Sequence, residues 1–413
     1  MYVQRKNLLE ELYRLRNDIN SGEGTVKIIS GLYHCGKSSL MEDYELFLTQ
    51  NGVRKDQIMS FHFERLRYDP ICNEATLYNY VVRKMNKDRM NYLFLQEARF
   101  APGILKTIDS LSIHKNMDIY ITCSDEYLER EELSDMLFGK TVSFHVLPLS
   151  LAEYGQLFDF GETSPGTSIS KEELYTGYVS SGGLPYLLSR GLPSFDLARD
   201  YMQGLYSTIL VHDIVPHRQI TDTSILEYLL YFLSLHVGEI FSPKKISDLL
   251  REAGRPINAR TVDSYIEAFV QTFLLYRVKR YDLVKEEVLQ TLEKYYPADT
   301  GFTHFFFGIQ MDPLSSGTIE TLVFLEMKRR GYDIYLGKIY SSGISFVCMK
   351  NTERVYIQVV SDMQDTGEVD QAVRSLQKLR DNYPKYLISG RELSWSHKGI
   401  RYISIYDFLL LND

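Results

Sequence analysis

Short apolar runs alternate with amphipathic stretches over the first 155 residues of the chain. The runs are rich in β-branched and aromatic side chains and therefore predict strands. We expect these strands at 25–29, 58–63, 92–95, 119–122 and 141–146. Apolar residues three and four positions apart predict helices after the first run and over 74–87. Strands that alternate with helices are typical of a parallel sheet covered by helices, so we expect an α/β fold.

The pattern becomes mainly helical after a turn-rich break at 160–166. Between 224 and 297 it predicts three helices and a hairpin. The second of these helices begins after the N-cap Ser242, with Pro243 in its first position, and the third begins after the N-cap Asn258. The hairpin strands are expected at 274–278 and 288–296. Three helices followed by a hairpin are typical of a winged helix-turn-helix.

A second α/β pattern follows residue 300. It predicts helices at 317–330, 370–380 and 406–411. It predicts strands at 333–336, 344–348, 354–360 and 386–388.

The segment GLYHCGKSS lies between the first predicted strand and the first predicted helix. It fits the phosphate-binding pattern G-x-x-x-x-G-K-[ST] in the strand–loop–helix context that this pattern requires. The backbone N–H groups of such a loop, and the helix N-terminus behind it, face phosphate groups. Lys37 would reach the β- and γ-phosphates, and the Ser38 hydroxyl would ligate Mg²⁺. We expect nucleotide to bind at Gly31, Cys35, Gly36, Lys37, Ser38 and Ser39.

Hydrolysis needs acidic side chains after this loop. An Asp at the end of a buried strand holds Mg²⁺, and a neighbouring Glu polarises the attacking water. Here the apolar strand at 92–95 is followed by Gln96 and Glu97. Glu97 is the expected catalytic carboxylate, and the alternative is a surface carboxylate at a strand end. Gln96 occupies the metal-binding position but brings no charge, so we expect weaker Mg²⁺ binding and slower hydrolysis.

Polar residues follow the next strand, 119–122. Thr122 and Ser124 are candidates for orienting the water and sensing the γ-phosphate, and an ordinary strand-to-loop turn is the alternative. Lys140 is a candidate for a further cation at the γ-phosphate. Arg130 and Arg218 are candidates for an arginine supplied to a neighbouring subunit, which would require an oligomer.

Composition narrows the classes of function. The 413 residues are 44% hydrophobic and 24% charged, which is typical of a globular chain of several domains. No apolar run approaches 18 residues, and the charged N-terminus is unlike a secretory signal, so we expect no membrane partner. Four separated cysteines favour a reducing cytoplasm. A net charge of −8 does not itself indicate nucleic-acid binding, so a DNA or protein partner would depend on the local surface of 242–296.

Together these segments resemble a family of prokaryotic AAA-type ATPases in which a P-loop domain precedes a C-terminal domain of unassigned function. The matching segments are GLYHCGKSSL at Gly31, YLFLQEAR at Tyr92, IYITCSDEYL at Ile119, LFGK at Leu137, PLSLAEY at Pro148, SGGLPYL at Ser181, TILVHDI at Thr208, KYYPADTG at Lys294, MKRRGYDIYLGK at Met327 and YIQV at Tyr356. The resemblance implies ATP and Mg²⁺ as ligands. It also implies a kinship with archaeal-type ATPases that carry winged-helix and nuclease-like tails.

The resemblance divides the chain into four expected domains. These are an AAA-like P-loop domain with a parallel sheet, a helical lid or linker, a winged helix-turn-helix and a restriction-endonuclease-like α/β domain. Their expected boundaries are 1–160, 161–223, 224–300 and 301–413.

The chain departs from the family pattern at polar positions. The family usually has Asp where this chain has Gln96, Gly where it has Cys123 and Arg where it has Lys140. A nuclease of the expected type needs an Asp on one strand and Glu-x-Lys on the next, because two carboxylates must hold its metal. This chain has Ser345 and 358–360 at those places, and Glu320 alone cannot hold a catalytic metal. We therefore expect the last domain to be a catalytically inactive scaffold.

The leading hypothesis is an ATP-binding, AAA-like protein, acting as a slow Mg²⁺-dependent ATPase that couples nucleotide state to the winged-helix and nuclease-like module. The alternative is a non-hydrolysing, nucleotide-gated module that binds DNA or protein.

Overall fold

The computed structural model describes residues 3–17, 25–65, 68, 70, 73–101, 103–126, 137, 140–158, 169–189, 194–217, 220, 222–361, 365–390 and 395–411. The chain forms two compact units. The first contains 2–146 together with 271–273, and the second contains 147–270 and 274–413. Among the described residues, no helix has the length and apolar character needed to cross a membrane.

The first unit is built on a five-stranded parallel sheet with the order β2-β3-β4-β1-β5. Its strands are β1 Val26–Ser30, β2 Ile58–His62, β3 Asn91–Gln96, β4 Met117–Cys123 and β5 Thr141–His145. All five correspond to apolar runs of the sequence, so the predicted parallel α/β sheet is confirmed. β4 lies between β1 and β3, and this position determines which loops meet at the carboxyl edge of the sheet.

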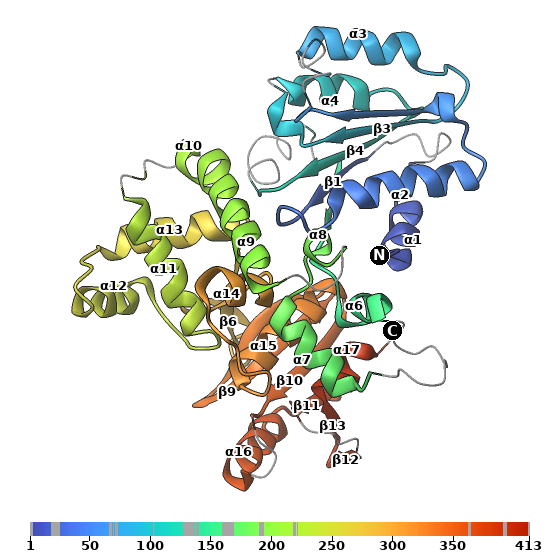
Figure 1. Cartoon of the computed structure of the whole chain (residues 1–413). Coiled ribbons are helices and arrows are strands. Elements are labelled where there is room, and N and C mark those ends of the chain that lie inside the picture. Colours follow the sequence, from blue (N-terminus) through green and yellow to red (C-terminus); the bar gives the residue numbers. More distant parts are fainter. Residues whose placement is uncertain are drawn as a thin grey trace. The chain divides into compact units, whose positions relative to one another are not determined.

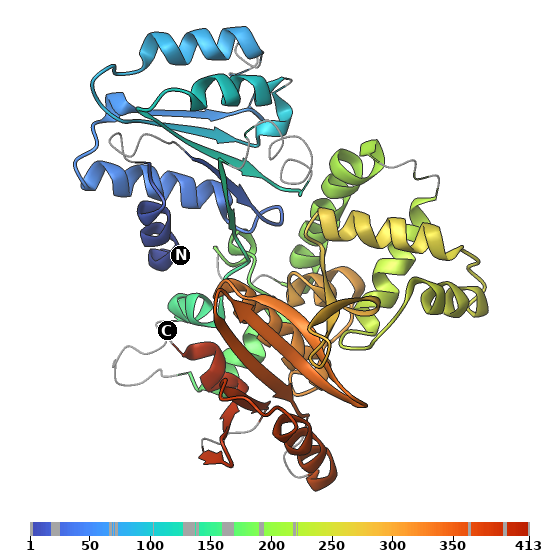
Figure 2. The same ribbon diagram turned by 180° about the vertical axis from the view of Figure 1, so that it is seen from behind.

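Helices cover both faces of this sheet (Figures 1 and 2). The helices are α1 Lys6–Arg14, α2 Lys37–Gln50, α3 Glu74–Lys84 and α4 Ile104–Ser112, with short 3₁₀ turns at Lys55–Gln57 and Ala98–Phe100. On one face, Ile28 and Ile121 pack with Val81 of α3 and Ile108 of α4 in a buried apolar cluster. On the other face, Tyr44 of α2 contacts the rings of Phe94 and Tyr120 at centroid distances of 6.2 and 5.3 Å.

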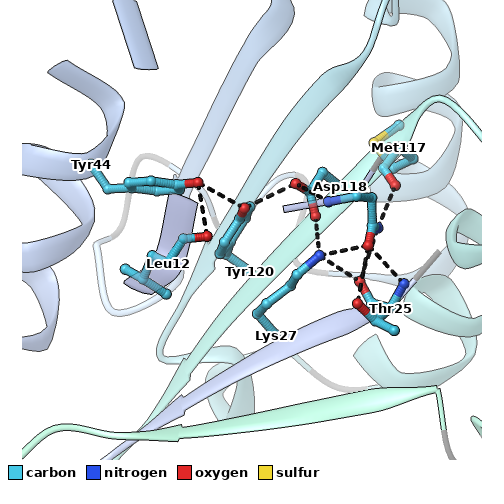
Figure 3. A network of polar contacts seen from close by, with 8 residues as sticks. Leu12, Thr25, Lys27, Tyr44, Met117, Asp118 and Tyr120 are labelled. Carbon is cyan, nitrogen blue, oxygen red and sulfur yellow. Dashed lines mark hydrogen bonds and ion pairs between the residues drawn. The ribbon is translucent and has the colours of Figure 1, made fainter. Parts of the chain in front are cut away.

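A buried ion pair lies at the amino edge of the sheet (Figure 3). Lys27 Nζ of β1 is 2.6 Å from Asp118 Oδ1 of β4, and neither side chain is exposed. The lysine also donates to Asn17 Oδ1 at 2.7 Å and to the Thr25 carbonyl oxygen at 3.2 Å. Asp118 Oδ2 accepts from the Tyr120 hydroxyl at 2.9 Å and from the Asn17 N–H at 3.1 Å. The pair is thus hydrogen-bonded on both sides, as a buried charge pair must be.

Burial lowers the pKa of the Lys27 ammonium, and the charge of Asp118 opposes this shift. Burial likewise raises the pKa of the Asp118 carboxyl, against the opposing effect of Lys27. Each partner therefore favours the charged form of the other in a place that water does not reach.

The second unit begins with helices. Those before its sheet are α6 Leu151–Gly155, α7 Lys171–Ser181, α8 Pro185–Leu188, α9 Phe195–Ile209, α10 Val215–His217, α11 Thr223–Leu235, α12 Pro243–Glu252 and α13 Ala259–Gln271, with a 3₁₀ turn at Gln156–Phe158 and a π-helical turn at Leu210–Ile214. The predicted N-caps are confirmed. Ser242 Oγ accepts from the Lys245 N–H at 3.2 Å, and Asn258 Oδ1 accepts from the Thr261 N–H at 2.9 Å.

An eight-stranded mixed sheet forms the rest of this unit, in the order β12-β13-β11-β10-β9-β8-β6-β7. Its strands are β6 Leu275–Asp282, β7 Glu287–Pro297, β8 Asp333–Ile339, β9 Ser342–Lys350, β10 Glu353–Val359, β11 Lys385–Ser389, β12 Trp395–His397 and β13 Ile400–Ser404. The helices between and after them are α14 Thr300–Phe307, α15 Ser316–Arg329, α16 Thr366–Gln377 and α17 Ile405–Leu410. Strand β6 of the hairpin β6–β7 pairs with β8. The predicted domain boundary at 300, between the winged helix-turn-helix and the endonuclease-like domain, therefore falls between strands of one sheet.

Two segments of the second unit meet at the buried side chain of Asp299, the N-cap of α14. Its carboxylate accepts from the N–H of Gly183 at 2.6 Å and of Phe302 at 3.0 Å. Gly182 has a φ of +71°, and a Cβ there would lie 2.1 Å from Asp299 Oδ1. Burial raises the pKa of Asp299 to about 6, although the backbone N–H groups oppose this shift. The segments SGGLPYL and KYYPADTG are therefore joined by one carboxyl group and a glycine that cannot be replaced without strain.

Removing Asp118 should strongly destabilise the first unit. In Asp118→Ala, Lys27 loses its carboxylate while it stays buried, which costs about 3–5 kcal/mol of unfolding free energy. Denaturant unfolding measures the loss. The matched control is Asp56→Ala, which breaks the exposed pair with Arg54 and should cost about 0.5 kcal/mol. Similar losses for both variants would contradict the role given to the buried pair.

Removing Asp299 should destabilise the second unit more than removing an exposed N-cap. Asp299→Ala leaves buried N–H groups without their acceptor, and we expect a loss of about 2–4 kcal/mol in denaturant unfolding. Asp365 caps α16 in the same way but is exposed, so Asp365→Ala should cost about 1 kcal/mol. Equal losses for the two variants would show that burial adds nothing to the cap.

Candidate nucleotide site

The loop that leaves β1 requires glycine at two positions. Gly31 has a φ of +150°, and a Cβ there would lie 2.2 Å from the carbonyl oxygen of Val146. Gly36 has a φ of +103° and is the N-cap of α2, which begins at Lys37. These residues let the backbone curl directly into a helix N-terminus, where N–H groups without helical partners can bind an anion.

The side chain of Lys37 folds into this loop. Its Nζ donates to the carbonyl oxygens of Gly31 at 2.8 Å and Leu32 at 3.1 Å, and to Ser124 Oγ at 2.9 Å. The residue is only 5% exposed. The ammonium thus uses three donors, and two of its acceptors belong to the loop itself.

Glu97 lies next to this lysine, directly after β3. Its backbone is left-handed, with a φ of 50°, and its N–H donates to Thr122 Oγ1 at 3.0 Å. The Glu97 Oε1 atom accepts from Ser124 Oγ at 2.9 Å and is 3.9 Å from Lys37 Nζ. A left-handed non-glycine residue costs about 1 kcal/mol or more, so the contacts around it must hold it in place.

The pKa of the Glu97 carboxyl is raised, because the effect of burial exceeds that of its polar neighbours. Burial raises the pKa of its carboxyl, while the Lys37 ammonium and the Ser124 hydrogen bond lower it. The same lysine therefore favours the ionised form that a general base needs.

Gln96, the last residue of β3, is 1% exposed. Its Nε2 lies 3.3 Å from His62 Nε2, at the end of the neighbouring strand β2. Its Oε1 is buried and has no hydrogen-bond partner among the described residues. One polar atom of this carboxamide is thus paired with the histidine, and the other is left with unused capacity for a ligand.

The structure brings most of the predicted site residues together. Lys37, Glu97, Thr122 and Ser124 form one hydrogen-bonded cluster, and Gly31, Cys35 and Gly36 shape the loop beside it. Ser38 and Ser39 lie in the first turn of α2, half-buried and exposed respectively.

Lys140, the one other predicted cation that the structure describes, does not join this cluster. Lys140 precedes β5, and its carbonyl accepts from the N–H of Val26 at the start of β1. It therefore lies at the amino edge of the sheet, whereas the loop leaves β1 at the carboxyl edge, so the interpretation as a γ-phosphate contact is wrong for this site. Arg130 and Arg218 lie outside the described residues.

Two family models and two relatives match this chain. A family model of an AAA domain matches residues 23–155, and a model of a domain of unknown function (DUF8612) matches 172–312. A protein of Haemophilus influenzae, described as uncharacterised, is 30% identical over 411 residues, covering 99% of this chain and 98% of the relative. An uncharacterised protein of Methanocaldococcus jannaschii is 23% identical over 393 residues, covering 92% of this chain and 85% of the relative.

The chain belongs to a family of P-loop AAA-type ATPases with a C-terminal domain of unknown function. The resemblance inferred from the sequence is therefore confirmed. Among solved structures, the Walker-type ATPase of Pyrococcus abyssi has a TM-score of 0.47 at 13% identity, covering 74% of this chain and 96% of that chain. AMPPCP-bound DnaA from Aquifex aeolicus has a TM-score of 0.30 at 14% identity, covering 64% of this chain and 85% of that chain.

Two residues near the loop of this member of the AAA-type family were not predicted from the sequence. His62 contacts Gln96 because β2 and β3 pair in parallel and end together. The sequence predicted a parallel sheet but not which strands are neighbours, so this contact was not foreseen. Arg5 donates from Nη1 to the Cys35 carbonyl oxygen at 3.4 Å. No motif marks Arg5 among the many charged residues of the N-terminal segment, and only the tertiary structure places it beside the loop.

The residues present fit a nucleotide phosphate well and a magnesium ion less well. The two glycines, Lys37 and the start of α2 provide a cradle and positive charge. Oxygen ligands suit Mg²⁺, and Ser38 with the unpartnered oxygen of Gln96 would supply two neutral ones. Because neither carries charge, the site offers less neutralisation of the cation than a carboxylate would.

Proposed function

We propose that this protein binds ATP with Mg²⁺ at the Gly31–Ser39 loop and hydrolyses it slowly. The observation that supports the proposal most is the contact of Lys37 with Ser124, which in turn contacts Glu97. A cation, a hydroxyl and a carboxylate that meet beside a glycine loop are the groups that phosphoryl transfer to water needs.

Each residue has a distinct role in this proposal. The loop N–H groups and Lys37 bind the phosphates. To do so, the Lys37 ammonium gives up its hydrogen bonds to the loop carbonyls and donates to phosphate oxygens instead. Glu97 orients a water molecule and takes its proton, and Thr122 fixes the backbone that aims this carboxylate. Ser124 links Lys37 to Glu97 and so responds to the γ-phosphate. Bound Mg²⁺ would supply neutralisation of phosphate charge, with Ser38 and Gln96 holding it.

A non-hydrolysing nucleotide switch is the second candidate, and Gln96 specifically favours it. The neutral carboxamide removes a carboxylate from the metal side of the site without disturbing the loop or Lys37. Binding would then persist without turnover.

The second unit supports a partner-binding role coupled to nucleotide state. The helices α11, α12 and α13 followed by the hairpin β6–β7 match the order of a winged helix-turn-helix. Arg277 of β6 pairs with Asp263 and Glu267 of α13, at 3.4 and 3.3 Å, which compensates acidic charge on the helix that would face DNA. Exposed basic side chains lie on α12, at Lys244, Lys245 and Arg251, and on α13, at Arg260. We propose this 242–296 segment as the contact for DNA or protein, in a bacterial or archaeal cytoplasm.

The remainder of the sheet supports a nuclease-like scaffold. Helix α15, the antiparallel strands β8, β9 and β10, helix α16 and the parallel strand β11 follow the order of the expected endonuclease-like core. Gln358 Oε1 accepts from the Ser345 N–H at 3.1 Å, and Glu320 Oε2 contacts Lys294 Nζ at 2.7 Å. These polar groups bond to protein partners, and we propose that the scaffold positions the hairpin rather than cleaving nucleic acid.

Lys37→Ala tests the ATPase proposal. Purified protein should release phosphate from ATP in the presence of Mg²⁺, and the variant should lose turnover by about 100-fold, because Lys37 binds the phosphates. Phosphate release measures the rate, and fluorescent ATP measures binding in the same preparation. Equal rates in both proteins would mean that a contaminant hydrolyses ATP. Absence of nucleotide binding to the wild type would overturn the proposal.

Gln96→Asp distinguishes the slow ATPase from the switch. The new carboxylate should tighten Mg²⁺ binding to the ATP complex by about 10-fold or more and raise turnover. The measurements are turnover and ATP affinity as functions of Mg²⁺ concentration. Gln96→Asn is the matched control, because it changes length without adding charge. An unchanged Mg²⁺ dependence in Gln96→Asp would contradict the metal-site role of this position.

A further inference from the structure

Arg5 is a buried cation that contacts the back of the nucleotide loop. It is 6% exposed and is the N-cap of α1. Its Nη1 donates to the carbonyl oxygen of Cys35, the residue before Gly36. When the N–H groups of a loop face an anion, several of its carbonyls face the protein and need donors there. Lys37 serves the carbonyls of Gly31 and Leu32, and Arg5 serves that of Cys35.

The helix that carries Arg5 is fixed to the core of the first unit. Leu9 and Leu12 of α1 are buried, and the Tyr44 hydroxyl of α2 donates to the Leu12 carbonyl at 3.2 Å. Tyr13 of α1 contacts the ring of Phe47 edge-on at a centroid distance of 5.4 Å. α1 therefore holds its position through side chains of α2 and not only through its own ends.

The far end of this helix joins the buried ion pair at the amino edge of the sheet. A chain of polar contacts runs from the Leu12 carbonyl through Tyr44, Tyr120 and Asp118 to Lys27 (Figure 3). Asn17, which follows α1, contacts both Lys27 and Asp118. A nine-residue helix is about 13 Å long, so α1 extends from this network toward the loop at the opposite edge.

We propose that Arg5 is a positioning residue for the nucleotide loop, held in place by α1 and the Lys27–Asp118 network. The inference rests on the nucleotide binding proposed above. Arginine suits this role because its planar guanidinium remains charged and can hold a carbonyl with one nitrogen while its other donors serve further partners. It fixes the carbonyl side of the loop and adds positive charge behind the phosphates.

The alternative is that Arg5 only stabilises the fold. Two measurements separate these roles: amide hydrogen exchange of residues 31–38 in nucleotide-free protein, and affinity for fluorescent ATP and ADP. The variants are Arg5→Gln and Arg5→Lys. The control is Arg14→Gln. It removes a cation from the same helix, and the Arg14 side chain is 80% exposed.

We expect Arg5→Gln to speed exchange in the loop but not in β3 or α4. We also expect it to weaken ATP binding by about 10-fold. Arg5→Lys should recover part of the affinity, and Arg14→Gln should remain within about twofold of the wild type. If Arg5→Gln does not fold, Arg5→Lys decides by the same measurements.

Two results would overturn the proposal. One is unchanged loop exchange and unchanged affinity in Arg5→Gln. The other is faster exchange spread evenly over the first unit, which marks a purely structural residue. If the wild type binds no nucleotide, the proposed function fails. Faster amide exchange in Arg5→Gln that is confined to residues 31–38 would still support the role of Arg5 in holding the loop.

Discussion

The order of strands in the first unit is the constraint on which the candidate site depends. In a parallel sheet all carboxyl ends lie at one edge, so the residues that follow adjacent strands meet there. β4 lies between β1 and β3. Ser124 after β4 therefore lies between Lys37, 87 positions away, and Glu97, 27 positions away. Without β4 between them, the lysine and the carboxylate would lose Ser124 as the hydroxyl that links them.

The same edge shows why a neutral residue at position 96 is compatible with a stable fold. Glu97 is buried, and burial already raises the pKa of its carboxyl. A second carboxylate beside it would disfavour ionisation further whenever no cation is bound. Gln96 avoids this repulsion and pairs with His62 instead. Gln96 therefore adds no further rise to the pKa of Glu97, but it attracts metal less strongly than a carboxylate would.

The sequence predicted the elements whose hydrophobic pattern is regular, including the five strands of the first sheet and the N-caps Ser242 and Asn258. It did not predict α14, because this helix has only eight residues, four of them phenylalanines, which is too short a pattern to establish a helical period. Nor did it predict that the hairpin β6–β7 continues into the last sheet, since strand pairing between distant segments leaves no local signal.

The site was predictable to the extent that it follows from strand ends. Motif spacing indicated Lys37, Glu97, Thr122 and Ser124, which the structure places in contact. The same rule, applied to Lys140, would have excluded it, because a residue that precedes a parallel strand lies at the opposite edge. Arg5 could not be found in this way, because a helix outside the strand–helix alternation brings it to the loop.

The two edges of this sheet are polar in different ways, and the difference indicates where movement can occur. At the amino edge, Lys27 has three acceptors and Asp118 has three donors. Breaking any of these bonds would leave a buried charge poorly solvated, so the spacing of β1 and β4 is fixed. At the carboxyl edge, Lys37 bonds to loop carbonyls that a phosphate can replace, and Gln96 keeps an unused polar atom. A bound nucleotide would therefore change the loop and the residues after β3, while β1 and β4 remain the rigid frame against which that change occurs.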